Sequence, residues 1–311
     1  MTAQLPSIPV TVVIPAFDRA ALVGRAVTSA LSQRLPPAEV LVVDDASTDG
    51  TADAAESAGA RVIRLTENRG RAGARNVGIE AASQEFIALL DSDDEWYPGH
   101  LNALWPHRDE AVLLAASTIG SLSRRVEGNP TLVPRILRSP RDVLWPVNPI
   151  PTSTVLVRKL DVQAVGGFAA LDLCEDLDLW IRLLERGKGL VVSNLSATYH
   201  EHEGQVSQDR SLMRLAELQV LDSYRSRPWY DDSIRRRLQV KNDWDGAQAA
   251  LAAGDRPTAG RHLVKLLTVQ RVFWLASLWR CRRRMAHPRL EIAEPVRSSL
   301  VNDSVKPPGL A

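Results

Sequence analysis

The fold of this chain is decided by the stretch Phe86-Ile87-Ala88-Leu89-Leu90-Asp91-Ser92-Asp93-Asp94, in which five apolar residues run directly into three carboxylates. An apolar run without a two-residue period is typical of a strand that is buried on both faces. Runs of the same kind occupy residues 10–14, 40–43 and 61–65, and a helical pattern follows each of them. Strands that alternate with helices predict an α/β fold with a mostly parallel central sheet flanked by helices.

The helices of this pattern have readable boundaries. The first is expected to open at Asp18 or Arg19, the second at Thr51, and a third of small residues covers 70–82. Further along, 154–157 is predicted to be a strand and 175–186 a helix ended by a glycine. The Pro-, Arg- and Ser-rich segment from Gly120 to Pro151 is expected to be mostly loop.

Composition excludes several classes of protein. With 38 basic and 37 acidic residues the net charge is +1, which gives no support for a nucleic-acid partner held by bulk charge. The two cysteines make no disulfide framework and lack metal-ligand spacing. Residues 1–9 show no signal-peptide pattern, and no apolar run approaches the roughly eighteen residues of a membrane span. We therefore expect a cytoplasmic protein.

Two acidic clusters follow strands directly, at Asp44-Asp45 and at Asp91-x-Asp93-Asp94. Like charges packed this closely cost Coulomb energy unless a cation or hydrogen-bond donors compensate them. Oxygen ligands in small number suit Mg²⁺ or Mn²⁺, which complete their shells with water and phosphate oxygens. The alternative is that these residues are helix caps and turn formers. Three carboxylates in four positions after a central strand favour the metal site.

A helical wheel over 173–184 places one carboxylate at an unexpected position. Glu175, Asp178 and Arg182 fall on the face where solvent is expected, whereas Asp176 lies at the edge of the apolar face. A carboxylate there either caps the helix or acts as a general base in a cleft. Downstream, His200 and His202 lie on one side of an extended segment and are either surface residues or ligands of a metal or phosphate.

In order and spacing, these pieces resemble the family-2 glycosyltransferases of the GT-A fold over roughly residues 8–207. The matching motifs are Val12-Val13-Ile14-Pro15-Ala16-Phe17-Asp18-Arg19, Val42-Val43-Asp44-Asp45-Ala46-Ser47-Thr48-Asp49-Gly50-Thr51, Asn68-Arg69-Gly70, Ala74-Arg75-Asn76-Val77-Gly78, the stretch at 86–94, Gly166-Gly167-Phe168, Glu175-Asp176-Leu177-Asp178-Leu179-Trp180, and Tyr199-x-x-His202 with Ser207. Each motif is modest alone, and their number and order make the match specific.

The resemblance implies an inverting transfer of a sugar from a nucleoside-diphosphate sugar, expected to be a UDP-sugar, to a hydroxyl acceptor. Residues with an implied role in holding the nucleotide sugar are Pro15, Phe17, Asp45, Arg75, Asp91 and Ser92. Asp93, with His202, is implied to hold the divalent cation, Mn²⁺ or Mg²⁺, in an Asp91-x-Asp93 motif. Asp176 is implied to be the catalytic base, with Glu175 beside it.

The resemblance also implies a domain plan. Residues 1–207 would be the catalytic domain, with a nucleotide half over about 8–105 and an acceptor half over about 106–207; a helical extension follows over 208–285, and 286–311 is expected to be poorly ordered. The basic pattern near 264–284 is either an amphipathic helix on the inner face of a membrane or a plain extension. The first would suit a lipid-linked acceptor in cell-envelope polysaccharide synthesis; glycans and other hydroxyl compounds are the alternatives.

Two other functions compete with this interpretation. A catalytically silent member of the family would bind a sugar nucleotide as a sensor or scaffold, although intact Asp93 and Asp176 speak against it. A nucleotidyltransferase would need a glycine-rich loop with basic residues after the first strand, where this chain has Pro15-Ala16-Phe17. Transfer of a sugar remains the favoured prediction.

Overall fold

The computed structural model describes residues 6–119, 134–144, 148–198 and 210–266. Within them, nine strands form one sheet in the order β3-β2-β1-β4-β8-β6-β9-β5, and β7 also pairs with β9. The strands are β1 (Ile8–Ala16), β2 (Pro37–Asp44), β3 (Arg61–Arg64), β4 (Phe86–Leu89), β5 (Glu95–Trp96), β6 (Leu113–Ile119), β7 (Arg135–Leu137), β8 (Leu156–Arg158) and β9 (Gly189–Thr198).

The α/β class with helices on both faces of a central sheet is confirmed. Parallel pairing joins β3, β2, β1 and β4, so that the four strands of the first ninety residues behave as the sequence predicts. Beyond β4 the sheet is mixed, because β8 runs antiparallel to both β4 and β6 while β6 and β9 are parallel. The expected parallel sheet is therefore a property of the first half of the fold.

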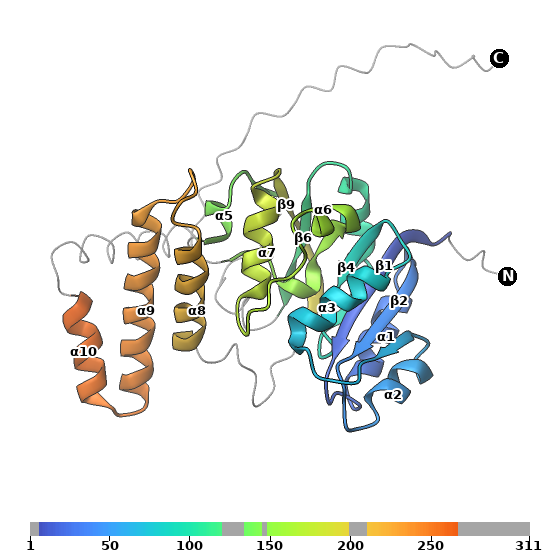
Figure 1. Cartoon of the computed structure of the whole chain (residues 1–311), viewed down its shortest axis with the longest axis horizontal. Coiled ribbons are helices and arrows are strands. Elements are labelled where there is room, and N and C mark those ends of the chain that lie inside the picture. The colour runs from blue at the N-terminus through green and yellow to red at the C-terminus, as the bar shows by residue number, and fades with distance from the viewer. Residues whose placement is uncertain (1–5, 120–133, 145–147, 199–209, 267–311) are drawn as a thin grey trace, which may run out of the picture.

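The helices cover the two faces of the sheet (Figure 1). They are α1 (Val23–Leu31), α2 (Thr51–Ser57), α3 (Gly70–Ala81), α4 (His100–Leu104), α5 (Arg141–Leu144), α6 (Lys159–Ala164) and α7 (Glu175–Leu184). One core contains side chains of α1, α2 and α4, and the other contains side chains of α3, α6 and α7. Val12 and Val13 of β1 point into different cores, as the strand's pleat requires.

The first helix begins later than predicted, at Val23 rather than at Asp18 or Arg19. Asp18 has a left-handed backbone with φ of 48°, and a helix cannot pass through that conformation. Its carboxylate accepts a hydrogen bond from the Thr48 backbone N–H (2.8 Å) instead. The polar residues after β1 therefore serve a loop, and the sequence pattern did not distinguish this loop from a helix start.

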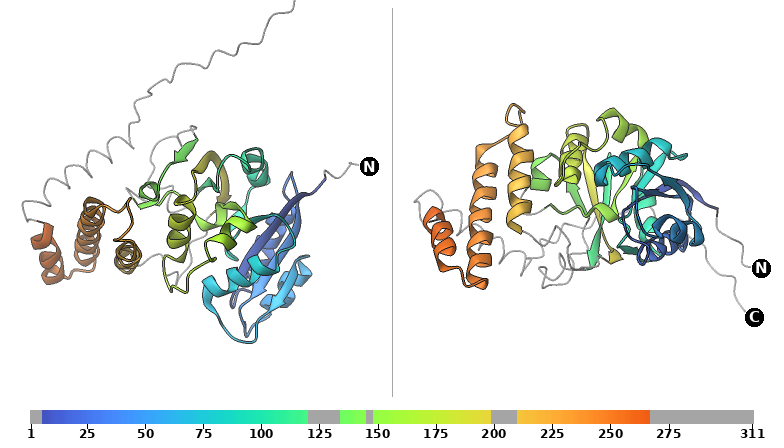
Figure 2. Two further views of the ribbon diagram at one scale, coloured as in Figure 1. Left: turned by 45° about the horizontal axis from the view of Figure 1, so that its top comes forward. Right: turned by 60° about the horizontal axis from the view of Figure 1, so that its bottom comes forward.

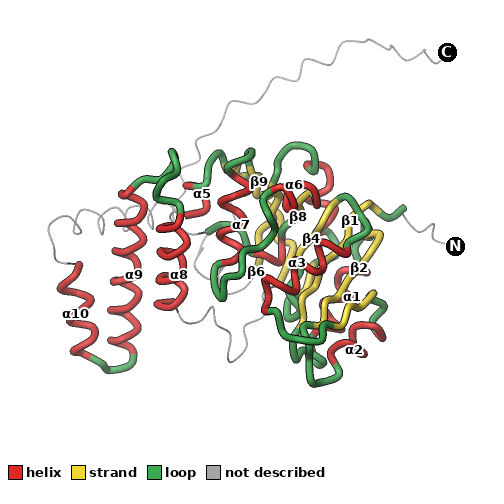
Figure 3. Tube along the Cα trace, viewed as in Figure 1, coloured by secondary structure: helices red, strands yellow, loops and turns green. Residues whose placement is uncertain are grey.

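Three helices follow the sheet: α8 (Arg210–Ser223), α9 (Asp232–Ala252) and α10 (Arg256–Leu266). They stand side by side, with α8 against α7 and α10 on the far side of α9 (Figures 1 and 2). No strand lies among them in the described part of 210–266 (Figure 3). The same residues, like the rest of the described chain, contain no helix long and apolar enough to cross a membrane. The basic pattern near 264–284 lies almost wholly outside the described residues, as does 286–311.

Candidate active site

The predicted site residues gather where parallel strands end. Ala16 at the end of β1 pairs with Asp44 at the end of β2, and the Asp45 N–H donates to the Ala16 carbonyl (2.8 Å). Because β4 runs beside β1 in the same direction, the loop that begins at Asp91 leaves from the same edge. Carboxyl ends of neighbouring parallel strands form the usual ligand-binding crevice of such sheets. Pro15, Phe17, Asp45 and Asp91 are thus brought to one edge.

Two loops of this edge are bound to each other through their backbones. The Asp18 N–H donates to Ser47 Oγ (2.9 Å), and the Arg19 N–H donates to Thr51 Oγ1 (2.7 Å). Ala46 shares the left-handed backbone of Asp18, with φ of 62°. Such conformations cost free energy in residues other than glycine and persist where surrounding contacts enforce them. The loops after β1 and β2 therefore form one rigid unit.

Within this unit the side chains differ in exposure. Pro15 and Asp45 are buried, and Asp45 Oδ1 accepts a hydrogen bond from the Arg69 backbone N–H (2.7 Å). This contact fixes Asp45 beside the start of α3. Phe17 is 43% exposed, an unusual position for a phenylalanine that packs in no core. An exposed ring beside a buried carboxylate is a suitable platform for stacking a planar base.

Arg75 of α3 is the most deeply placed charge of the site, with 2% of its surface exposed. Its Nη2 donates to Asp91 Oδ1 and its Nη1 donates to Glu175 Oε1, each at 2.7 Å. Burial alone would lower the pKa of Arg75, but the two carboxylates raise it, so the guanidinium stays charged. Arg75 therefore joins the loop after β4 to the start of α7.

Asp176 is the second residue of α7 and lies one position from Glu175. Its Oδ2 accepts a hydrogen bond from Thr152 Oγ1 (3.2 Å) and its Oδ1 from the Leu177 N–H (2.7 Å). Burial, and then the charge of Glu175, raise the pKa of Asp176 to about 6, against the opposing effects of these hydrogen bonds and of Arg75. A carboxyl with this pKa is ionised at neutral pH and basic enough to take a proton.

The expectation that Glu175 and Asp178 face solvent is wrong. Glu175 is buried because Arg75 reaches it from α3, and Asp178 is buried because α8 covers that side of α7. Tyr224, which directly follows α8, donates its hydroxyl to Asp178 Oδ1 (2.6 Å), while Arg182 donates to Oδ2 from Nε (2.9 Å). The helical periodicity of 173–184 predicts the apolar stripe correctly, but it contains no information on polar partners from other elements.

The loop after β4 offers carboxylates suited to a divalent cation. Asp91 and Asp93 are partly exposed, whereas Asp94 is buried and its Oδ2 accepts from Ser153 Oγ (2.5 Å). Within the described residues no three His, Cys, Asp or Glu side chains cluster as a complete metal site. Mg²⁺ or Mn²⁺ would need only one or two carboxylates here, because these ions complete their shells with phosphate oxygens and water. The predicted ligand His202 lies outside the described residues.

Two residues of this site were missed at the sequence level, namely Thr152 and Ser153 in a short 3₁₀ turn, η3 (Thr152–Thr154), before β8. Thr152 contacts Asp176, and Ser153 contacts the loop after β4. Three consecutive hydroxyl residues after Pro151 are the only signal in the sequence, and such runs also occur in ordinary turns.

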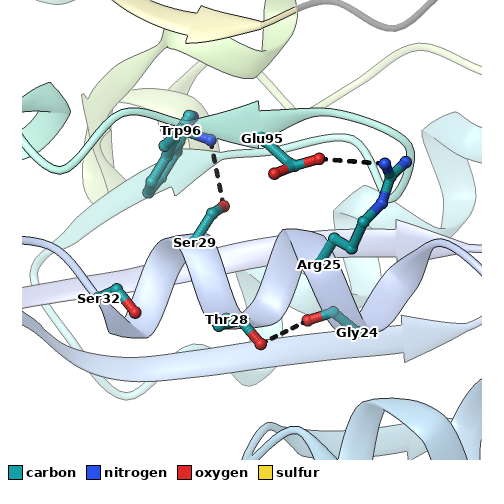
Figure 4. A pocket seen from close by; sticks show the side chains of 7 residues that line it. All are labelled: Gly24, Arg25, Thr28, Ser29, Ser32, Glu95 and Trp96. Carbon is teal, nitrogen blue, oxygen red and sulfur yellow. Dashed lines mark hydrogen bonds and ion pairs between the residues drawn. The ribbon is translucent and has the colours of Figure 1, made fainter.

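A separate hollow lies between α1 and β5 (Figure 4). Arg25 and Glu95 form an ion pair across it (3.3 Å), and Ser29 Oγ accepts from the Trp96 backbone N–H (3.1 Å). The other lining residues are Gly24, Thr28 and Ser32. None of the predicted site residues lines this hollow, and its ion pair joins two exposed side chains. The strand ends, with their buried charges, are the better candidate site.

The chain is similar in sequence to known glycosyltransferases. The model of the family named glycosyl transferase family 2 matches residues 11–147. A pre-mycofactocin glycosyltransferase of Mycobacterium tuberculosis is 36% identical over 216 residues, which are 63% of this chain; the chain spans only 43% of that relative's length. The Escherichia coli UDP-Glc:alpha-D-GlcNAc-diphosphoundecaprenol beta-1,3-glucosyltransferase WfaP is 30% identical over 223 residues, covering 69% of this chain and 86% of the relative.

Two solved structures share the fold. The first 349 residues of S. aureus TarS, in complex with UDP-GlcNAc, superpose with a TM-score of 0.61 at 17% identity, over 90% of this chain and 88% of that 349-residue chain. The mannosyltransferase PcManGT of Pyrobaculum calidifontis, in complex with GDP-Man and Mn²⁺, has a TM-score of 0.59 at 19% identity, over 91% and 88% of the two chains. The two solved structures show the shared fold, and the family model with the sequence match to WfaP over most of its length establishes that this chain belongs to glycosyl transferase family 2.

Proposed function

We propose that this chain transfers a sugar from a nucleoside-diphosphate sugar to a hydroxyl group of an acceptor, with inversion at the anomeric carbon. The observation that carries the proposal is the Arg75 bridge, which joins Asp91 after β4 to the first turn of α7, where Asp176 lies. It couples a carboxylate suited to the donor with one suited to proton transfer.

The donor would occupy the edge formed by the loops after β1, β2 and β4. Phe17 would stack on the base, buried Asp45 would accept from it, and Pro15 would line the same wall. Arg75, Asp91 and Ser92 would hold the nucleoside from the other side. We favour a uridine base, since an aspartate accepts from the imide N–H that uracil offers.

Asp93, with His202, would hold the divalent cation in the Asp91-x-Asp93 motif. The cation would supply positive charge to the diphosphate of the donor.

Asp176 would act as the base, with Glu175 held beside it by Arg75. The acceptor hydroxyl gives its proton to the Asp176 carboxylate, and the acceptor oxygen bonds to the anomeric carbon. The bond from that carbon to the diphosphate oxygen breaks, and its electron pair leaves with the nucleoside diphosphate. A pKa of about 6 leaves Asp176 mostly ionised at neutral pH, as this step requires.

The acceptor would be a glycan, a lipid-linked sugar or another hydroxyl compound. The name of WfaP specifies a sugar on diphosphoundecaprenol as the acceptor of that protein. A lipid-linked acceptor of this kind would suit a cytoplasmic enzyme working at the inner face of a membrane, in cell-envelope polysaccharide synthesis.

The test uses the full chain with Mn²⁺ and a panel of UDP-, GDP- and dTDP-sugars, followed by melting temperature and by release of nucleoside diphosphate. A matching donor should raise the melting temperature, since ligands that bind the native state stabilise it. Asp93→Asn should lose this metal-dependent rise. Asp176→Asn should keep the rise and lose about 10²- to 10⁴-fold in turnover.

Asp53→Asn is the matched control, because Asp53 is 84% exposed and pairs with Arg64 at the surface. It should behave as the unaltered chain does. Unchanged turnover in Asp176→Asn would exclude Asp176 as the base. Donor binding with no turnover by the unaltered chain, across donors and acceptors, would favour the silent sensor or scaffold.

A further inference from the structure

The η3 turn lies between the two carboxylate groups of the site. Ser153 Oγ accepts a hydrogen bond from the Asp91 backbone N–H (3.1 Å) and donates to Asp94 Oδ2 (2.5 Å). One residue earlier, Thr152 Oγ1 donates to Asp176 Oδ2 (3.2 Å). Neighbouring hydroxyls therefore contact the loop of the expected metal site and the expected base.

The turn itself is firmly held. Ser153 is 2% exposed, and its carbonyl accepts from Trp96 Nε1 (2.5 Å). Thr154 is fully buried, and its hydroxyl donates to the Pro151 carbonyl (2.8 Å). Trp96 in turn stacks on buried His100, with ring centroids 4.2 Å apart. A hydroxyl on this support has little freedom to move, so it can fix the group it contacts.

These contacts close a ring with the Arg75 bridge. One arm is ionic and runs from Asp91 through Arg75 to Glu175, next to Asp176. The other arm is neutral and runs from Asp176 through Thr152 and Ser153 back to the Asp91 backbone. The ionic contacts are made by the guanidinium at the end of the long Arg75 side chain, whereas the neutral contacts are made by short hydroxyl side chains on a firmly held turn.

We propose that Thr152 and Ser153 are positioning residues with separate tasks: Thr152 orients the base Asp176, and Ser153 holds the Asp91–Asp94 loop in the shape that receives the donor and its cation. This inference rests on the proposed function and adds to it the element that fixes the distance between donor and base. The tasks are separable because each hydroxyl contacts a different carboxylate group.

Thr152 also influences the proton affinity of Asp176. A hydroxyl that donates to a carboxylate favours its ionised form. Asp176 also accepts a hydrogen bond from the Leu177 backbone N–H, and the charges of Glu175 on its own helix and of Arg75 on α3 act on it. Arg71 of α3 lies 3.8 Å from Glu175. Thr152→Val leaves these groups in place and removes the Thr152 hydroxyl. The pKa of Asp176 should then rise by about one unit, because its ionised form loses one hydrogen-bond donor.

The experiment measures each task separately in the full chain. The titration of Asp176 is followed by NMR with ¹³Cγ-labelled aspartate and assigned by its disappearance in Asp176→Asn. Donor binding is followed by the melting-temperature rise with Mn²⁺ and the donor found for the unaltered chain, or with UDP and Mn²⁺ when no donor turns over. Transfer, where present, is measured against pH.

Thr152→Val should raise the pKa of Asp176 by about one unit, shift the acid limb of the transfer profile equally, and leave the donor KM within about twofold. Thr152→Ser should restore the pKa of Asp176 and the position of the acid limb. Ser153→Ala should weaken donor binding about tenfold and leave the titration of Asp176 unchanged. Thr154→Val reports the structural cost of losing a buried hydroxyl from this turn, and should lower stability without moving the titration.

The inference would be overturned if Thr152→Val left the pKa of Asp176 unchanged. It would also be overturned if Thr152→Val and Ser153→Ala changed the pKa of Asp176 and donor binding by the same amounts. Neither the titration nor UDP binding requires transfer. An unaltered chain that transfers no sugar would therefore refute the proposed function while the two tasks of the turn were still decided.

Discussion

The two sides of the candidate site are built in different ways. On the donor side, the loops after β1 and β2 are bound together by backbone N–H groups that donate to side chains of 47–51, and two residues there have left-handed backbones. On the base side, the contacts join polar side chains of different elements, as between Arg75 of α3 and Glu175 of α7. The donor side is thus fixed by backbone hydrogen bonds between two loops, and the base side by buried charge.

This difference has consequences for stability and for function. A turn fixed by several backbone hydrogen bonds loses little when one of them is removed, because the others remain. A buried charge that loses its partner keeps its full cost of desolvation. We therefore expect variants on the base side to have larger effects, and the predictions below test that order.

The largest effect is expected for Arg75→Met. This change leaves Glu175 buried without its cation and removes the partner of Asp91. Breaking a buried pair costs about 3–5 kcal/mol, so the free energy of unfolding in urea should fall by that amount and transfer should be abolished. Adding Glu175→Gln should recover part of the stability, because it removes the uncompensated charge.

Arg71→Met is the matched control for this prediction. Arg71 lies one helical turn from Arg75 and 3.8 Å from the same carboxylate, but 54% of its side chain is exposed. Exposed pairs contribute about 0–1 kcal/mol, so this variant should unfold almost as the unaltered chain does. Equal losses in the two variants would contradict the view that burial makes the Arg75 bridge important.

The same contrast explains what the sequence could predict. The four parallel strands, the helices at Thr51 and Gly70 and the edge that carries Asp45 and Asp91 follow from short apolar runs and their ends, and the structure contains all of them. These features depend on neighbours in the chain. The roles proposed for their side chains remain predictions.

The base side was less predictable for a physical reason. Whether Glu175 is buried depends on Arg75, and whether Asp178 is buried depends on Tyr224, directly after α8. No periodicity within 173–184 contains that information. The role of the η3 turn could not be predicted for the same reason, because the partners of its hydroxyls lie in α7 and in the loop after β4.

The second prediction concerns how far the base side extends. Tyr224→Phe removes the hydroxyl that donates to buried Asp178 (2.6 Å) and keeps the ring that packs on Trp229. Loss of a hydrogen bond to a charged group should cost about 1.5–3 kcal/mol in urea unfolding. Tyr97→Phe is the control, since Tyr97 is 39% exposed and the hydrogen bond that its hydroxyl accepts from Thr198 lies at the surface, so that its loss should cost well under about 1 kcal/mol. A negligible loss in Tyr224→Phe would mean that α8 does not support α7.

The third prediction uses the pH dependence of stability. The pKa of Asp176 is about 6 in the folded chain and near its ordinary value when unfolded, so the folded state binds more protons between about pH 4 and 6. Stability therefore falls as pH rises through this window, and ionised Asp176 opposes folding above it. At pH 7.5 the free energy of unfolding of Asp176→Asn should exceed that of the unaltered chain by about 1–2 kcal/mol, and this difference should vanish near pH 4. A difference that is the same at both pH values would show that ionisation is not its source.

The smallest effect is expected on the donor side, at Ala46, where φ is 62°. A left-handed conformation costs alanine about 1–2 kcal/mol relative to glycine. The greater conformational freedom of glycine in the unfolded chain offsets about 0.4–1 kcal/mol of this gain. Ala46→Gly should therefore stabilise the chain by about 0.5 kcal/mol, measured by urea unfolding. Ala58→Gly should have the opposite sign, because Ala58 has an ordinary φ of −79° and gains nothing from relief of strain. Loss of stability in Ala46→Gly would mean that the methyl group makes contacts worth more than the strain, and the donor side would then depend on packing as well as on its turns.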